Sequence, residues 1–173
     1  MTATIQRRSN RPLTQYACDF LDEFLKGKLE SCEHSNENTA IKCSITKGSA
    51  GAVEHFSVFL YGTEILDVLM CNEHPVHVKI GISKQFTIEG YPKKTTIERL
   101  NGLLDELGGH GIIPAGVRIF KDRIENLFYL GKGDNKIAVG KGLATEVLLA
   151  PDQHEFRVQA TDLYINNEKG KKA

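Results

Sequence analysis

The chain has 173 residues, of which 40% are hydrophobic and 25% are charged, and its formal net charge is zero. This composition is ordinary for a globular protein of one domain. It argues against functions that need a large basic excess, such as strong non-specific binding to nucleic acid or to an anionic membrane. No apolar run approaches the roughly 18 residues of a membrane span, and the N-terminus lacks the apolar segment of a secretory signal. We therefore expect a cytoplasmic protein with no membrane partner, whose four cysteines are free thiols.

The neutral total hides a local asymmetry of charge. Arg7, Arg8 and Arg11 lie close together near the N-terminus with no acidic residue among them. Residues 1–11 are therefore expected to be a mobile basic segment, residues 12–165 a single domain and residues 166–173 a disordered, solvated tail.

A helix is predicted over residues 12–31. Its apolar side chains recur at helical spacing, and they are Leu13, Tyr16, Ala17, Phe20, Leu21, Phe24 and Leu25. The opposite side carries polar residues, which are Gln15, Asp19, Asp22, Glu23 and Lys26. We expect Phe20 and Phe24 to lie in the core and the polar side to face solvent. The alternative is a helix that binds a partner or a second copy of the chain.

After a polar loop at 33–39, the hydrophobic period changes to two. Alternation of apolar and polar residues predicts short strands that follow one another as an antiparallel meander, at residues 41–46, 56–61, 65–69, 76–82 and 86–88. A hairpin at 117–130 and a last strand near 155–159 follow, while residues 137–149 are apolar but interrupted by glycine. The fold class is therefore predicted as α+β, with an antiparallel sheet of about five to seven strands and two main helices packed on it.

The second helix is predicted to begin at Thr95 or Thr96 and to end at Gly108 and Gly109. Thr95 and Glu98 have the spacing of a capping box. Lys93, Lys94 and Arg99 add positive charge to a helix N-terminus, whose free amides favour anions. This segment is the candidate ligand-binding or anion-binding site, with five residues: Lys93, Lys94, Thr95, Thr96 and Arg99. The alternative is ordinary capping with solvated lysines.

Three other patterns give weaker signals. The cysteines and histidines of Cys32-Glu33-His34 and Cys71-Asn72-Glu73-His74-Pro75-Val76-His77 do not have the paired spacing of a zinc site, so we expect the chain to carry no stoichiometric metal ion. No nucleophilic motif accompanies Cys71. The segment 131–142 is rich in glycine and lysine but does not match a phosphate-binding loop, so a flexible solvated loop is expected. No cofactor is expected.

Residues 95–104 read Thr95-Thr96-Ile97-Glu98-Arg99-Leu100-Asn101-Gly102-Leu103-Leu104. This run follows the pattern Thr-Thr-x-x-Arg-Leu-Asn-x-Leu-Leu, and through it residues 55–130 resemble a family of small, functionally unassigned proteins of tailed bacteriophages. The resemblance extends to the segment Phe59–Leu66, where a strand ends before Gly62, and to the aromatic hairpin Val117–Leu130. Tyr91 stands where the family has Trp, and Thr63 where it has Asn. The resemblance implies a phage accessory protein and no particular activity.

The function expected from the sequence is thus non-enzymatic binding of a host protein or of a small anionic ligand in the host cytoplasm. The alternative is nucleic-acid binding through Arg7, Arg8, Arg11 and the helix start at 93–99. Assembly into a homo-oligomer stays open.

Overall fold

The computed structural model describes residues 12–29, 31–36, 38–82, 87, 89–152 and 155–160. It confirms an α+β fold with two helices, a seven-stranded antiparallel sheet and a three-stranded antiparallel sheet. The helices are α1 (Pro12–Leu25) and α2 (Lys94–Gly109). The strands are β1 (Ser31–Asn36), β2 (Thr39–Gly48), β3 (Gly51–Leu60), β4 (Thr63–Cys71), β5 (His74–Gly81), β6 (Arg118–Asp122), β7 (Leu127–Lys132), β8 (Asn135–Val139), β9 (Glu146–Asp152) and β10 (Glu155–Ala160).

The large sheet consists of a five-stranded meander, β1 to β5, to which the last two strands of the chain, β9 and β10, are added. Its strand order is β1-β2-β3-β4-β5-β9-β10, so five consecutive strands pair in sequence order before β9 adds to β5. The small sheet has the order β6-β7-β8. The chain thus leaves the large sheet after β5, forms α2 and the small sheet, and then returns to pair with β5.

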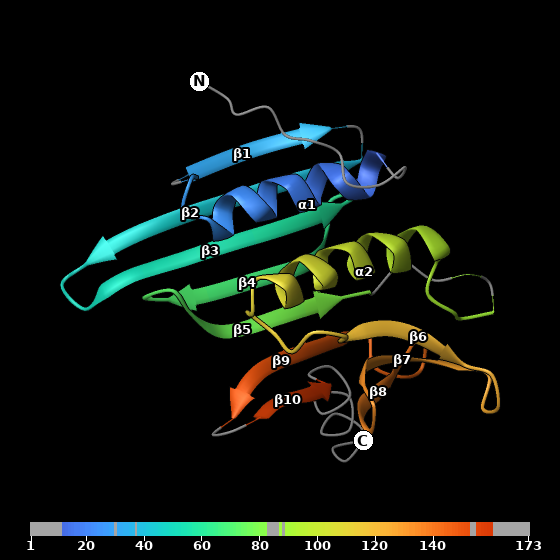
Figure 1. Cartoon of the computed structure of the whole chain (residues 1–173). Coiled ribbons are helices and arrows are strands. Elements are labelled where there is room, and N and C mark those ends of the chain that lie inside the picture. Colours follow the sequence, from blue (N-terminus) through green and yellow to red (C-terminus); the bar gives the residue numbers. More distant parts are fainter. Residues whose placement is uncertain are drawn as a thin grey trace, which may run out of the picture.

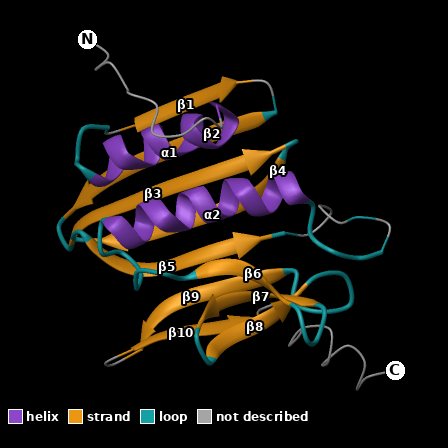
Figure 2. Ribbon diagram, turned by 45° about the vertical axis from the view of Figure 1, so that its right-hand side comes forward, coloured by secondary structure: helices purple, strands orange, loops and turns teal. Residues whose placement is uncertain are grey.

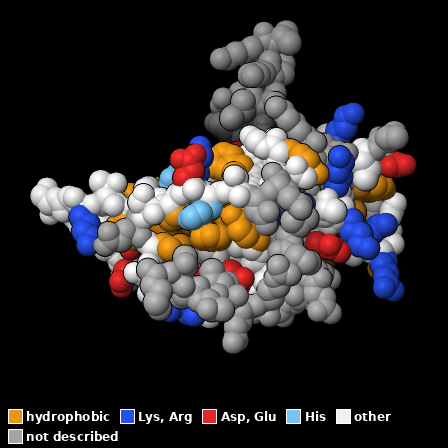
Figure 3. Space-filling view, turned by 90° about the horizontal axis from the view of Figure 1, so that it is seen from above, with side chains coloured by type: hydrophobic (Ala, Val, Ile, Leu, Met, Phe, Trp, Pro, Cys, Tyr) orange, Lys and Arg blue, Asp and Glu red, His pale blue; other side chains and the backbone are white. Residues whose placement is uncertain are grey.

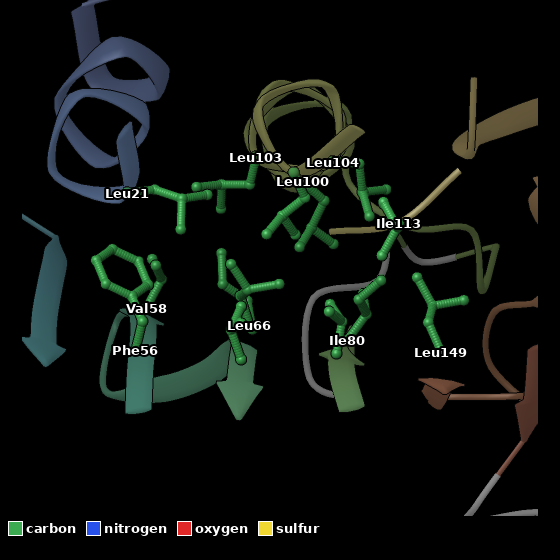
Figure 4. Packing of buried hydrophobic residues seen from close by; sticks show 14 of the residues in the cluster. Leu21, Phe56, Val58, Leu66, Ile80, Leu100, Leu103, Leu104, Ile113 and Leu149 are labelled. Atoms are coloured by element: carbon green, nitrogen blue, oxygen red, sulfur yellow. The ribbon is translucent and has the colours of Figure 1, made fainter. Parts of the chain in front are cut away.

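Both helices lie side by side on one face of the large sheet (Figures 1 and 2). Figure 4 shows the core between these layers, where Leu21 of α1 and Leu100, Leu103 and Leu104 of α2 point toward the sheet. The side chains that meet them alternate along the strands, as the period of two requires. The largest fully buried of these sheet residues are Phe56, Leu60, Leu66 and Ile80.

The small sheet is joined to α2 through Asn101. This buried side chain accepts a hydrogen bond from the Ile119 amide at 2.7 Å and donates one to the Ile119 carbonyl at 3.0 Å. Ile119 lies on β6, so both backbone groups of one residue of this strand are bonded by a single amide side chain of the helix.

Several predicted elements need correction. The first helix ends at Leu25 rather than near residue 31, because Gly27 adopts a left-handed conformation (φ 76°) that ends helices. The expected loop at 33–39 is largely strand β1, and the expected loop at 131–142 contains most of the β7–β8 hairpin. Within that hairpin, a Cβ on Gly131 would lie only 2.1 Å from the Asn135 carbonyl oxygen, so glycine is required there.

Some predictions fall on parts of the chain that the structure does not describe. The predicted strand at 86–88 falls largely on such residues. The predicted basic segment at 1–11 and the predicted tail at 166–173 also lie outside the described residues.

The predicted polar side of the first helix only partly faces solvent, because Lys26 is exposed but three of the other polar residues are buried. Gln15, Asp19 and Asp22 are buried, with 3%, 8% and 6% of their surface exposed. Gln15 donates a hydrogen bond of 2.6 Å to Asp19, and Asp22 reaches His110 at the end of α2. Phe24 is in the core as expected, whereas Phe20 is only partly buried and packs against Tyr16 and His34.

The four cysteines are not all free thiols. Cys32 and Cys43 stand opposite each other on β1 and β2 and form a disulfide. Cys18 is a buried free thiol, and Cys71 is a partly exposed one.

Candidate functional site

The N-terminus of α2 is open to a ligand. Helix α2 begins at Lys94, and its N-cap residue Lys93 has an extended backbone and makes no side-chain capping bond. The first helical hydrogen bond runs from the Ile97 amide to the Lys93 carbonyl at 3.0 Å. The amides of residues 94–96 therefore have no acceptor within the helix, and no other described residue accepts from them.

The predicted capping box does not form. Thr95 and Glu98 are the residues expected to exchange hydrogen bonds, but the helix starts one residue earlier, so Thr95 lies inside the first turn. Its side chain is exposed. The first turn therefore keeps its partial positive charge, with no acidic side chain in it.

Two further lysines, from other parts of the chain, contact the segment that precedes this helix start. Lys121 is near the end of β6, and its ammonium lies 5.8 Å from the centre of the Tyr91 ring. The Lys141 amide donates to the Gly90 carbonyl at 2.9 Å. The segments around Gly90 and Lys141 are also close at Gly140, where an added Cβ would lie 3.0 Å from the Gly90 carbonyl oxygen.

We call Lys93, Lys94, Lys121 and Lys141 the lysine corner. All four side chains are exposed, and none makes an ion pair with a described residue. In Figure 3, Lys and Arg side chains gather at one end of the molecule, the end at which α2 begins in Figure 1. The lysine corner therefore combines the free amides of the helix start with exposed lysines at that start and on the two segments that contact residues 90 and 91.

The remaining predicted site residues lie elsewhere. Thr96 is fully buried, and Arg99 is buried with 6% of its surface exposed, so neither belongs to the surface of the corner. The Thr96 hydroxyl and the Arg99 Nε have no hydrogen-bond partner among the described residues. Arg7, Arg8 and Arg11 fall in the part of the chain that is not described.

A second polar cluster lies on the sheet face that faces away from the helices. Ser57 Oγ donates to Asp67 Oδ1 at 3.0 Å, His77 Nε2 contacts Oδ2 at 3.1 Å, and His55 Nε2 contacts Oδ1. Burial alone would raise the pKa of Asp67, but the hydrogen bonds from His77, His55 and Ser57 outweigh it and hold this pKa below its usual value.

This cluster does not have the geometry of a serine–histidine–aspartate triad. In a triad the imidazole uses one nitrogen for the carboxylate and the other for the serine. Here Ser57 Oγ and the Asp67 carboxylate both contact Nε2 of His55, and Ser57 is 2% exposed. The arrangement binds and positions a buried carboxylate, and it offers no accessible nucleophile.

The fold does not bring together the cysteines and histidines that the sequence places close to one another. Cys32 is in a disulfide, and the histidine nearest to Cys71 in the strand pairing is the exposed His74. His77 is turned to Asp67.

Comparison of the chain with protein-family models, with curated proteins and with solved structures gives no match. Neither of the described helices is long and apolar enough to cross a lipid bilayer.

Proposed function

We propose that this chain is a non-enzymatic binding protein that holds a phosphate-bearing ligand at the lysine corner. One observation carries the proposal: the uncapped start of α2 carries Lys93 and Lys94, and two further exposed lysines contact the segment just before it, Lys121 at Tyr91 and Lys141 at Gly90. Backbone amides at a helix start bind the oxygens of an anion directionally, and the helix dipole favours negative charge there. Lysine ammonium groups add charge without fixing the orientation of the ligand.

The surroundings of the corner support binding rather than a chemical step. The Tyr91 phenol beside the corner has an oxygen that accepts a hydrogen bond of 3.0 Å from Asn126. No described histidine or carboxylate pairs with a nucleophile at this place, as an acid–base mechanism would require. The phosphate group can belong to a small molecule or to a host protein. The resemblance to phage proteins supports a role in the host cytoplasm.

A second function, binding of single-stranded nucleic acid, is favoured by one observation on the small sheet. Phe120 of β6 and Tyr129 of β7 are stacked with ring centres 6.0 Å apart. The Lys136 ammonium lies 4.4 Å from the centre of the Tyr129 ring. Aromatic rings beside cations form the platforms on which unpaired bases stack.

The proposal is tested with the variant Lys93→Glu plus Lys94→Glu in the full chain. Its control is Lys28→Glu plus Lys47→Glu, an equal charge change on exposed lysines near the other end of the molecule. The probes are inorganic phosphate, ATP and an oligothymidine of about 12 nucleotides, titrated at about 50 and 200 mM salt. We expect the corner variant to bind ATP at least tenfold more weakly than the parent, since each charge-assisted contact is worth about 1.5–3 kcal/mol.

The control variant should bind as the parent does. Equal binding of ATP by the corner variant and the parent would remove the corner as the site. A steep loss of oligothymidine binding with salt, together with weak binding of ATP, would favour the nucleic-acid function instead.

A further inference from the structure

The two helices bring three potential metal ligands together at their C-terminal ends. Asp22 Oδ1 of α1 lies 2.7 Å from Nε2 of His110, the C-cap residue of α2. Glu106 Oε2, one helical turn before His110, lies 3.8 Å from the same nitrogen. Among the described residues, these three are the one group whose ligand atoms all lie within 4.8 Å of one another.

Each ligand is placed by secondary structure. Glu106 and His110 are separated by four residues, so they share one side of α2. The His110 amide donates to the Glu106 carbonyl at 3.1 Å, which holds the ring beside the Glu106 carboxylate. Asp22 comes from the neighbouring helix, as ligands do in metal sites built between packed helices.

Two buried carboxylates lie beside an imidazole and an ammonium group at this place. Asp22 and Glu106 are both buried, with 6% and 9% of their surface exposed. Buried carboxylates close to one another repel and are stabilised by a positive charge between them. The Lys26 ammonium meets Asp22 on its other oxygen, Oδ2, at 2.8 Å, so Oδ1 is the atom directed at the cluster.

We propose that Asp22, Glu106 and His110 bind a divalent transition-metal ion, with Zn²⁺ as the best fit. The imidazole nitrogen favours Zn²⁺ over Mg²⁺ and Ca²⁺, which take oxygen ligands, and Zn²⁺ also binds carboxylate oxygens. In a tetrahedral zinc site with bonds near 2.0 Å, ligand atoms are about 3.3 Å apart. The observed separations of 2.7 and 3.8 Å lie on either side of this value.

A cavity borders the cluster at His110, the one of the three proposed ligands that lines it. It has a volume of about 290 Å³ and is lined by His110 together with Glu54, Glu73, Met70 and Ile112, among others. Three protein ligands leave a zinc ion with a fourth position for water or another small ligand. The polar lining of this cavity at Glu54 and Glu73 is compatible with a hydrated ion.

The test is calorimetric titration of ZnCl₂ into the full chain after treatment with a chelator. We expect one ion per chain, with binding at least tenfold weaker in His110→Ala and in Glu106→Gln. The matched control is His74→Ala, which removes an exposed histidine beside Cys71 and should bind zinc as the parent does. The Glu106→Gln variant keeps the shape of the side chain, so it tests the ligand even if His110→Ala fails to fold.

Co²⁺ provides a second readout, because its visible absorption reports low-symmetry coordination by nitrogen and oxygen. The Co²⁺ spectrum should be lost in Glu106→Gln and kept in His74→Ala. Zinc binding that survives Glu106→Gln, or that is lost in His74→Ala, would overturn the proposal, as would no binding by the parent. The variant Lys93→Glu plus Lys94→Glu should bind zinc normally, so this test and that of the lysine corner fail independently.

Discussion

Asp67 concentrates negative charge in the middle of the large sheet. It pairs with Ser57 on β3 and with Lys79 on β5, and 8% of its surface is exposed. A carboxylate buried to this degree is destabilising unless it accepts hydrogen bonds. The contacts from Ser57, His55 and His77 supply them from strands on both sides, so this residue ties three neighbouring strands together.

The lowered pKa of Asp67 makes stability depend on acid pH. Since this pKa is depressed in the folded state, the contribution is complete above the unfolded value of about 3.9 and is lost as pH falls through the folded pKa. We expect Asp67→Asn to lower the free energy of unfolding at pH 7 by about 1–3 kcal/mol. The variant should also lose less stability than the parent below about pH 4.

Urea unfolding between pH 2 and 7 measures both effects. The control is Asp134→Asn, at an exposed turn, which should keep the steep acid dependence of the parent. An unchanged pH profile in Asp67→Asn would show that the hydrogen bonds do not stabilise the carboxylate form.

At the scale of elements, α1 has one well-buried aromatic side chain and one at its margin. Phe24 is 4% exposed and packs against Phe56 with ring centres 5.2 Å apart. Phe20 is partly buried, and its ring lies 4.7 Å from that of His34 on the edge strand β1. The two residues are one turn apart, so they form a matched pair for measuring what the helix buries.

We expect Phe24→Ala to lower the free energy of unfolding by about 3–5 kcal/mol, because it opens a cavity in the core. Phe20→Ala should cost about half as much or less, because solvent already reaches the ring. Chemical denaturation of the two variants beside the parent measures the difference. Equal losses would mean that α1 buries both rings to the same extent in solution.

The elements with strong hydrophobic periodicity are those that the sequence predicts well. Alternation in 41–46 and 76–82 locates β2 and β5, because one side of each strand meets the helices. Strand β1 escapes prediction because it lies at the edge of the sheet and its side chains are mostly exposed, so it carries little periodic signal. The predicted start of α2 is too late, because Lys93 provides the cap position without the side-chain bond that the prediction assumes.

The candidate sites depend on contacts that sequence spacing does not contain. Lys93 and Lys94 are predicted from the sequence, but Lys121 and Lys141 reach the same corner only through the packing of the small sheet and the loop at Gly140. Likewise, the sequence pattern puts Asp22 on the solvent side of α1, and only the position of α2 brings it to the C-cap histidine of that helix. The spacing along α2 places His110 beside Glu106, one turn before it, but it does not indicate that Asp22 lies next to them.

At the scale of the whole molecule, Asn101 connects the small sheet to the rest. Its two hydrogen bonds to Ile119 are buried, so removing the amide leaves a backbone donor and an acceptor unpaired. We expect Asn101→Ala to cost about 2–4 kcal/mol. Hydrogen exchange should show faster exchange in β6 and β7 than in β3 and β4, since the loss begins at the attachment of the small sheet.

The matched control for this variant is Asn126→Ala, on the exposed turn between β6 and β7. It removes one exposed side-chain hydrogen bond to the Tyr91 hydroxyl and should change stability by under about 1 kcal/mol. A uniform rise of exchange over both sheets in Asn101→Ala would mean that they unfold as one unit.

The late return of the chain to β5 has a consequence for synthesis on the ribosome. Strands β1 to β5 pair with sequence neighbours, so the meander can form while the rest of the chain is still being made. Until residues 146–149 emerge, however, the outer side of β5 at residues 78–81 has no strand beside it. An unpaired strand edge is a template for pairing with another chain. A nascent or truncated chain that stops before Glu146 therefore exposes the edge of β5 to aggregation, whereas in the finished protein β9 pairs with this edge.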